Sequence, residues 1–302
     1  MAKSKVKTTE VHLYPIIDED LLHLNQITGP RGGMRAYQKP GDPLPLWSVT
    51  TILSNTVAKP ALMRWYNQQG REAVAEKLEP HVGKMLSEET LEEALREAGR
   101  RPKKTKEKAA DLGSRAHDWL SEYITSRIEG RPISTAPQDL MTVFDSFREW
   151  EEEAGIEQWL KTEFAVYSEG FRYAGSVDAL AYNRDGKFMV LDWKTGKGIY
   201  SEMALQVAAY ANALSFPLRV KVNGNLDFPW DTWERIEPWV IRLGKETAEF
   251  EARRVSNPQL ALDGFLNAMQ LWYSLNMPGL TDNAKAELED YFDLPDELPT
   301  VW

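Results

Sequence analysis

The 302-residue sequence contains no cysteine, which excludes disulfide bonds, zinc–thiolate sites and cysteine-ligated iron–sulfur clusters. It also lacks any apolar run near the roughly 18 residues that a membrane-spanning helix needs. The basic start, Met1 to Lys7, is not followed by an apolar stretch, so we expect no secretory signal, no membrane association and a cytoplasmic protein. No Gly-x-x-x-x-Gly-Lys-Ser/Thr loop occurs, which argues against a nucleotide-driven motor in this chain.

The sequence has fewer basic than acidic residues, with 36 Lys and Arg against 46 Asp and Glu, which gives a net charge of −10. Affinity for nucleic acids depends on Lys and Arg that meet phosphates. The balance therefore argues against tight nonspecific binding to long nucleic acids. The acidic residues are gathered at 88–93 and after Asp282, so a local basic channel is compatible with the total.

The apolar patterning predicts an α/β fold with a mixed central sheet flanked by helices, plus extra N-terminal helices. Helices are expected over 59–78, 86–98, 109–128, 139–154, 201–214 and 257–276. Strands are expected over 159–167, 173–182, 187–194 and 236–243, with a short strand or two and loops before residue 45. We expect an N-terminal decoration of loops and helices over 1–104, a core domain over 105–277 and an acidic tail over 278–302.

The most informative stretch is a predicted hairpin whose second strand ends in polar side chains. Asp-Gly at 185–186 lies between two apolar runs and is typical of a tight hairpin turn. Because side chains alternate across a strand, Asp192 and Lys194 point to one face and Trp193 to the other. Pairing across the turn can bring Asp178 to that same face, near Asp192.

Two carboxylates brought together repel one another, and burying either without a partner is unfavourable. A divalent cation removes both problems, because Asp oxygens are ligands that Mg²⁺ prefers. A lysine two residues from such a carboxylate can hold or deprotonate an attacking water, as in phosphodiester hydrolysis. Each pattern alone is also typical of a solvated strand end. Their combination on one hairpin, followed by a helix that carries Gln206 and Tyr210, favours the metal site.

These residues resemble the core of the PD-(D/E)XK nuclease superfamily, and in particular a cluster-free form of its RecB-type exonuclease branch. The matching positions, in chain order, are Gly113 with His117, then Asp178, then Asp192 with Lys194, then Gln206 with Tyr210. The resemblance covers about residues 105 to 245, with a weaker similarity near 48 to 70. It implies a restriction-endonuclease-like core.

The resemblance also implies roles for individual residues at a Mg²⁺ or Mn²⁺ site. Asp178 and Asp192 would hold the ion, and the backbone carbonyl of Trp193 would complete its coordination. His117 would ligate or support the metal, although a lone histidine on an apolar helix face is more often a core residue. Glu163, on the preceding strand, is a weaker candidate that could touch a second cation.

Three further side chains would act on the substrate. Lys194 would orient or deprotonate the water and offset charge on the phosphorus, which makes it a catalytic residue together with the two aspartates. Gln206 and Tyr210, at i and i+4 on one helix, would position the lysine or the phosphate.

The implied activity is that of a DNA exonuclease in recombination, repair or phage DNA processing, in a bacterial or phage-infected cytoplasm. Its substrate would be single-stranded DNA or a duplex with ends. A recombination, helicase or single-strand-binding protein would be its partner. Two alternatives stay open, namely an endonuclease selective for DNA structure or sequence, and a non-catalytic DNA-binding or regulatory protein.

Two stretches are candidates for direct DNA contact. The basic run over residues 99–108 is either a solvated loop or the entrance for the DNA backbone. Its candidate contact residues are Arg100, Arg101, Lys103, Lys104 and Lys106. Trp230 and Trp233 lie in a polar, Gly- and Pro-containing stretch, where they either stack on bases or anchor the loop.

Overall fold

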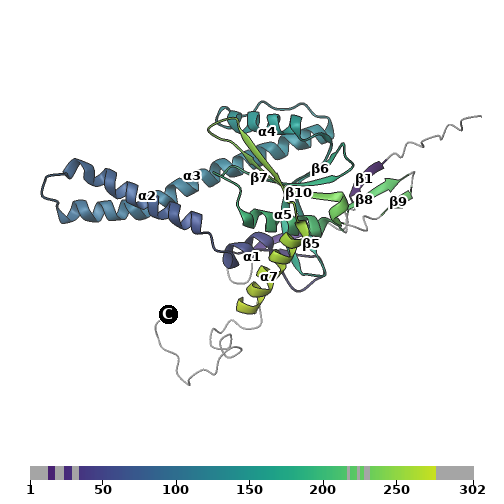
Figure 1. The fold of residues 1–302 in the computed structure, drawn as a ribbon, viewed down its shortest axis with the longest axis horizontal. Coiled ribbons are helices and arrows are strands. Elements are labelled where there is room, and N and C mark those ends of the chain that lie inside the picture. Colours follow the sequence, from purple (N-terminus) through teal and green to yellow (C-terminus); the bar gives the residue numbers. More distant parts are fainter. Residues whose placement is uncertain are drawn as a thin grey trace, which may run out of the picture.

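A mixed β-sheet forms the middle layer of the body, with helices against both of its faces (Figure 1). The computed structural model describes residues 13–17, 24–28, 34–215, 218–222, 225–227 and 232–276. Within these residues the sheet runs in the order β11 (Phe250–Arg254), β10 (Ile236–Leu243), β7 (Phe188–Lys194), β6 (Tyr173–Asn183), β4 (Leu46–Ser48), β3 (Arg35–Gln38) and β2 (Asn25–Thr28), and β5 (Ile156–Ser168) pairs with β6. The predicted mixed sheet flanked by helices is confirmed.

The predicted hairpin is confirmed as β6 and β7, which pair antiparallel with Ala179 opposite Leu191. Its turn is closed by the side chain of Asn183, whose Oδ1 accepts hydrogen bonds from the main-chain N–H groups of Asp185 (3.1 Å) and Lys187 (2.9 Å). Gly186 has a φ of 74°, in the left-handed region that favours glycine. The Asp-Gly pair therefore forms the turn that its sequence predicts.

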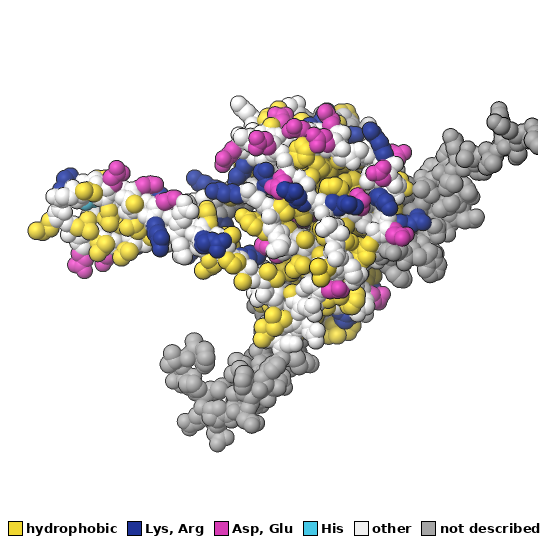
Figure 2. Space-filling model, viewed as in Figure 1, with side chains coloured by type: hydrophobic (Ala, Val, Ile, Leu, Met, Phe, Trp, Pro, Cys, Tyr) yellow, Lys and Arg dark blue, Asp and Glu magenta, His cyan; other side chains and the backbone are white. Residues whose placement is uncertain are grey.

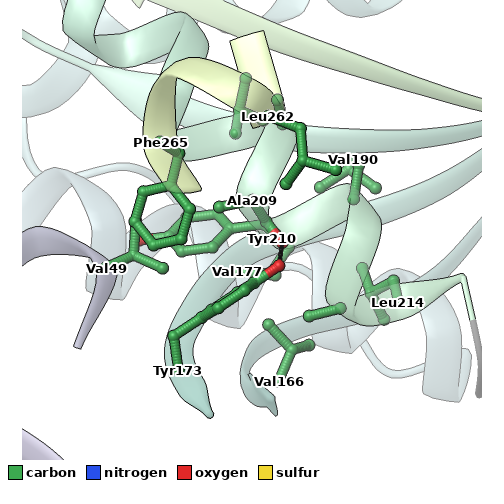
Figure 3. Close-up of a cluster of buried hydrophobic side chains, with 14 of the residues drawn as sticks. Val49, Val166, Tyr173, Val177, Val190, Ala209, Tyr210, Leu214, Leu262 and Phe265 are labelled. Atoms are coloured by element: carbon green, nitrogen blue, oxygen red, sulfur yellow. Dashed lines mark hydrogen bonds between the residues drawn. The ribbon is translucent and has the colours of Figure 1, made fainter. Parts of the chain in front are cut away.

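One face of the sheet is covered by α1 (Val49–Thr56), α5 (Ser201–Leu214) and α7 (Pro258–Asn276). The small residues of α5 let this helix lie close against the strands, as the buried Ala208 and Ala209 show. Tyr173 donates a hydrogen bond to the carbonyl oxygen of Ala209 (2.9 Å), and its ring packs edge-on against Phe265 (Figure 3). This core holds α5, with Gln206 and Tyr210, in a fixed position over β6 and β7.

The opposite face is covered by α4 (Met141–Glu153) and by the C-terminal half of α3 (Glu88–Glu129). The indole of Trp193 packs between Phe147 and Trp150, with ring centroids 5.6 and 5.1 Å away. Trp193 therefore lies on the face opposite to the one where Asp192 meets α5, as the alternation of β7 predicts.

An arm of two antiparallel helices, α2 (Pro60–Leu78) and the N-terminal half of α3, projects from the body (Figure 1). Ser87 caps α3 by accepting a hydrogen bond from the N–H of Thr90 (3.2 Å). Gly130, with a φ of 65°, ends the same helix. At the crossing, the main chains approach closely enough that a Cβ on Gly70 would lie 3.3 Å from the carbonyl oxygen of Ala98.

The expected break between two helices at residues 99–108 is wrong, because α3 is continuous through this run and contains Pro102. The basic run is therefore helical and not a loop, its role as an entrance for the DNA backbone stays a prediction, and the domain boundary expected at residue 104 falls inside the helix. Strands β2 to β4 extend the central sheet. Pairing and packing with the rest of the chain thus outweigh the local tendency of Gly99 and Pro102 to end a helix.

A second, small sheet joins β1 (Leu13–Ile17) to β8 (Leu218–Val222) and β9 (Asn225–Asp227), and a short helix, α6 (Thr232–Arg235), leads into β10. The predicted tail over 278–302 and Trp230 lie outside the described residues. Within the ranges given above, no helix combines the length and the apolar character needed to cross a membrane.

Candidate active site

The candidate site lies at a fork in the central sheet. One edge of β6 pairs with β5 along its length. The other edge pairs with β4 at Tyr173 and Ala174 and with β7 from Ala179 to Tyr182. Residues 175–178 of β6 therefore lie between the ends of two strands, where side chains from both helical layers can meet.

Three potential metal ligands converge at this fork from three different elements. Nδ1 of His117, on α3, lies 3.5 Å from Oδ2 of Asp178 on β6 and 3.7 Å from Oε1 of Glu163 on β5. One ligand atom from each residue lies within 4.8 Å of the other two. The set of one imidazole nitrogen and two carboxylate oxygens fits a divalent cation that accepts both kinds of ligand.

The backbone of β5 is distorted at the residue that contributes to this group. Glu163 has a φ of 45° inside a strand, a conformation that costs about 1–3 kcal/mol for a residue other than glycine. In the register of the strands, where Thr162 pairs with Ala179 and Phe164 with Val177, Glu163 lies opposite Asp178. The strained residue is therefore the one whose carboxylate meets Asp178 and His117.

Asp178 and Asp192 come directly after the last pair of the hairpin, Ala179 with Leu191, and the same register continued by one residue places them opposite one another. Asp178 is buried and accepts a hydrogen bond from the main-chain N–H of Trp193 (2.6 Å), which fixes its carboxylate in the fork. Asp192 is also buried. Its Oδ1 accepts a hydrogen bond from Nε2 of Gln206 (2.8 Å), and its Oδ2 lies 2.5 Å from Nζ of Lys194.

Asp192 lies beside the three-residue group and is not one of its members. Within the described part of the chain, its Oδ2 has no hydrogen bond of good geometry, and its close neighbour is the Lys194 ammonium. The charges of Asp178 and Asp192 act on one another, and Lys194 interacts electrostatically with both. The role of Asp192 as a metal ligand stays a prediction, as does that of the Trp193 carbonyl.

The electrostatics of the site reflect an excess of buried negative charge. Burial raises the pKa of Asp192 to about 6, with attraction from Lys194 opposing this change and repulsion from Asp178 adding to it. Burial alone would lower the pKa of Lys194, but the charges of the two aspartates raise it. Burial would likewise lower the pKa of His117, yet the adjacent carboxylates of Asp178 and Glu163 raise it to about 10. The surplus of carboxylates therefore favours a cation at this position.

Gln206 and Tyr210 form one surface of α5 that faces the fork. Nε2 of Gln206 donates hydrogen bonds to Asp192 and to the hydroxyl of Tyr210 (3.0 Å). The ring of Tyr210 fills the space above Gly175, where a Cβ would lie 2.2 Å from a ring carbon. The glycine that precedes Asp178 in the sequence motif is thus required by the tyrosine of the helix motif.

The glycine of the earlier helix also allows a close approach. A Cβ on Gly113 would lie 3.1 Å from Oγ1 of Thr195, the residue that follows β7. His117 follows Gly113 by one helical turn and therefore reaches the fork from the same face of α3. The spacing of these two residues brings the helix to the end of β7 and the imidazole to Asp178.

Tyr37, on β3, is a residue of the site that sequence reasoning missed. Its side chain is buried, and burial raises its pKa, with opposing effects from Arg35 and a further increase from the charge of Glu163. Its hydroxyl has no well-aligned hydrogen bond among the described residues. The alternation of Arg35 to Gln38 could have indicated a strand, but nothing local placed this strand beside β6.

Comparison with protein-family models and with curated proteins found no match. Of the candidate DNA contacts, Arg101 pairs with Glu76 of α2 (2.5 Å), whereas Lys103, Lys104 and Lys106 are exposed on α3. Arg100 is exposed on the same helix. Trp233 donates a hydrogen bond from Nε1 to Oε1 of Gln259 (2.8 Å), which anchors it to α7.

Proposed function

We propose that this protein is a divalent-metal-dependent nuclease that hydrolyses phosphodiester bonds of DNA. The observation that carries the proposal is the meeting of His117, Glu163 and Asp178 beside the Asp192–Lys194 pair. Such a group of carboxylates with an imidazole and an ammonium matches what phosphodiester hydrolysis needs, namely ligands for a cation and positive charge beside the phosphate.

His117, Glu163 and Asp178 would hold the ion, and we propose Mn²⁺ or Mg²⁺ because two of the three ligands are carboxylates. When bound, such an ion polarises a phosphoryl oxygen and lowers the pKa of a coordinated water. The N–H of Trp193 orients the Asp178 carboxylate, and the strand register keeps Glu163 opposite it. Asp192, on the adjacent strand, is the fourth candidate ligand.

The remaining polar residues would act on the water and the phosphate. Lys194, held by Asp192, places an ammonium beside the ligand group, where it would orient the attacking water and offset charge that develops on the phosphate oxygens. Gln206 fixes Asp192 through a hydrogen bond and is itself fixed against Tyr210. These contacts come from one helix, so the lysine and its carboxylate are held in one arrangement before substrate binds.

The motif order of the RecB-type branch supports DNA as the substrate and exonuclease action as the mode of cleavage. A gel of end-labelled single- and double-stranded oligonucleotides with Mn²⁺, Mg²⁺ or EDTA tests the activity. Asp178→Asn and Asp192→Ala should each abolish metal-dependent cleavage while keeping the fold. Asp185→Asn, in the exposed turn at the other end of the hairpin, is the matched control and should cleave as the wild type does.

Wild-type cleavage that survives in the Asp178→Asn and Asp192→Ala variants would overturn the proposal. A closed circular DNA separates the two modes of cleavage and the non-catalytic alternative. An obligate exonuclease leaves the circle intact, an endonuclease nicks it, and a non-catalytic binding protein only retards it in the gel.

A further inference from the structure

Helix α3 connects the candidate site to the projecting arm. His117 lies in its C-terminal half, and the basic run at residues 99–108 precedes it in the same helix. All residues from 103 to 117 follow Pro102, so they belong to one uninterrupted helical segment. The position of each lysine around the helix axis can therefore be compared with that of His117.

The basic run divides between two sides of the helix. Lys106 precedes His117 by eleven residues and Lys103 by fourteen, which places them about 20° and 40° from it around the axis. Lys104 and Lys108 lie about 140° and 180° away on the same reckoning. Two lysines thus share the face that leads to the site, and two point away from it.

The face shared with His117 is exposed from Lys103 to Ala110, and Gly113, one turn before His117, packs against Thr195 at the end of β7. Lys103 and Lys106 are exposed, and Ala110, which lies between them and the histidine on this face, is exposed and bears only a methyl group. Lys and Arg side chains gather on the visible surface where the arm meets the body (Figure 2).

Lys103 and Lys106, like Lys104 and Lys108, have no acidic partner among the described residues, whereas most arginines of α3 do. Four of the five arginines of α3 are neutralised in ion pairs, namely Arg96 with Glu92, Arg101 with Glu76, Arg115 with Asp139, and Arg127 with Glu151, and Arg100 is the exception among the described ion pairs. Lys103 and Lys106 form no ion pair within the part of the chain that the structure describes. In a protein with a net charge of −10, exposed cations left without acids on one line toward a site suit an anionic polymer.

We propose that Lys103 and Lys106 bind phosphates of the DNA strand that leaves the candidate site along α3 toward the arm. The inference rests on the proposed function and adds a substrate path to it. At 1.5 Å per residue, the lysines lie about 16 and 21 Å from His117 along the helix. Successive phosphates of one strand advance about 3.4 Å along the axis of a duplex, so with that axis along α3 the contacts fall about five or six nucleotides from the cleaved bond.

The matched variants are Lys106→Ala and Lys108→Ala, which remove the same charge from exposed positions two residues apart on opposite sides of the helix. Cleavage kinetics are measured with Mn²⁺, and binding of labelled DNA is measured in EDTA, both over a series of salt concentrations. Lys106→Ala should raise KM and Kd about fivefold to tenfold at 0.1 M salt and reduce the salt slope by about 0.7–0.9, the loss of one phosphate contact. Its kcat should change less than twofold, and Lys108→Ala should match the wild type.

Substrate length gives a readout that a structural role would not produce. The effect of Lys106→Ala should disappear on substrates with fewer than about five nucleotides on this side of the cleaved bond. Two results would overturn this inference while the wild type still cleaves DNA normally. One is an equal change in Kd and KM for Lys106→Ala and Lys108→Ala, and the other is a change that does not depend on substrate length. Either result would leave the proposed function unaffected. If the wild type binds DNA but does not cleave it, and Lys106→Ala weakens this binding, the contact between DNA and α3 would be supported and the proposed nuclease activity would be overturned. Absence of both binding and cleavage in the wild type would overturn both.

Discussion

Replacing Gly175 by alanine tests the coupling between the strand and helix motifs of the site. The new Cβ would lie 2.2 Å from one ring carbon of Tyr210 and 2.9 Å from another. Non-bonded carbons need about 3.5 Å, so the ring must withdraw by more than about 1 Å. Tyr210 is only 2% exposed, and a ring packed this tightly has no solvent-side space to enter.

Overpacking of this kind typically costs about 1–3 kcal/mol. Alanine also lowers the conformational entropy of the unfolded chain, which offsets about 0.4–1 kcal/mol of this loss in stability. We therefore expect a net loss of about 1–2 kcal/mol, which for a protein of about 300 residues lowers the Tm by roughly 2–3 °C. Displacement of Tyr210 also moves Gln206, which bonds both the tyrosine and Asp192, so cleavage should fall together with stability.

Urea denaturation and thermal unfolding measure the change. Gly170→Ala is the control, because a Cβ there would meet nothing within 4 Å, and we expect a gain of at most about 0.4–1 kcal/mol from the unfolded chain. Tyr210→Leu removes the ring, so in that background the effect of Gly175→Ala should shrink, as a double-mutant cycle would show. A Gly175→Ala protein as stable as the wild type, or an unchanged penalty in the Tyr210→Leu background, would refute the reasoning.

Three further predictions concern the charges and packing around the fork. The folded-state pKa of His117, about 10, lies above its ordinary value of 6.5. Protonation of His117 therefore stabilises the metal-free fold fully below about pH 6.5. This stabilisation is lost as the pH rises through 10. Denaturation in EDTA should accordingly show a larger gap between wild type and His117→Gln at pH 6 than at pH 10.5, and a constant gap would contradict the pairing with Asp178 and Glu163. Lys194→Met leaves Asp192 buried without its cation, so urea titrations at pH 8 should show a free energy of unfolding lower by about 3–5 kcal/mol. This loss should shrink at pH 5, below the Asp192 pKa of about 6. An equal loss at both pH values would contradict the ion pair. Trp193→Ala should cost about 3–5 kcal/mol in the same assay, because the indole packs between Phe147 and Trp150; a loss below about 1 kcal/mol would show that it does not.

Local patterning was sufficient for the hairpin and for the helix that follows it. Alternation put Trp193 and Asp192 on opposite faces, and Asp-Gly marked the turn, because both depend on residues adjacent in the chain. The spacing of four between Gln206 and Tyr210 likewise placed them on one side of a helix. These features account for most of the polar groups that meet at the fork.

The features that local patterning could not supply depend on distant parts of the chain. The left-handed φ of Glu163 appears only once β5 lies against β6. Tyr37 reaches the site because β3 joins the sheet through β4. The continuity of α3 through Gly99 and Pro102 depends on its packing with α2, where Arg101 pairs with Glu76. Each outcome is set by tertiary contacts that outweigh local preference.

Binding of Mn²⁺ is the most direct test of the claim that His117, Glu163 and Asp178 form a metal site. The full-length wild type, Asp178→Asn and the control Asp185→Asn are titrated with Mn²⁺ at pH 8, and free Mn²⁺ is followed by electron paramagnetic resonance. Wild type and Asp185→Asn should bind alike, whereas Asp178→Asn should bind at least about tenfold more weakly. Equal binding by all three proteins, or no binding by the wild type, would contradict the account.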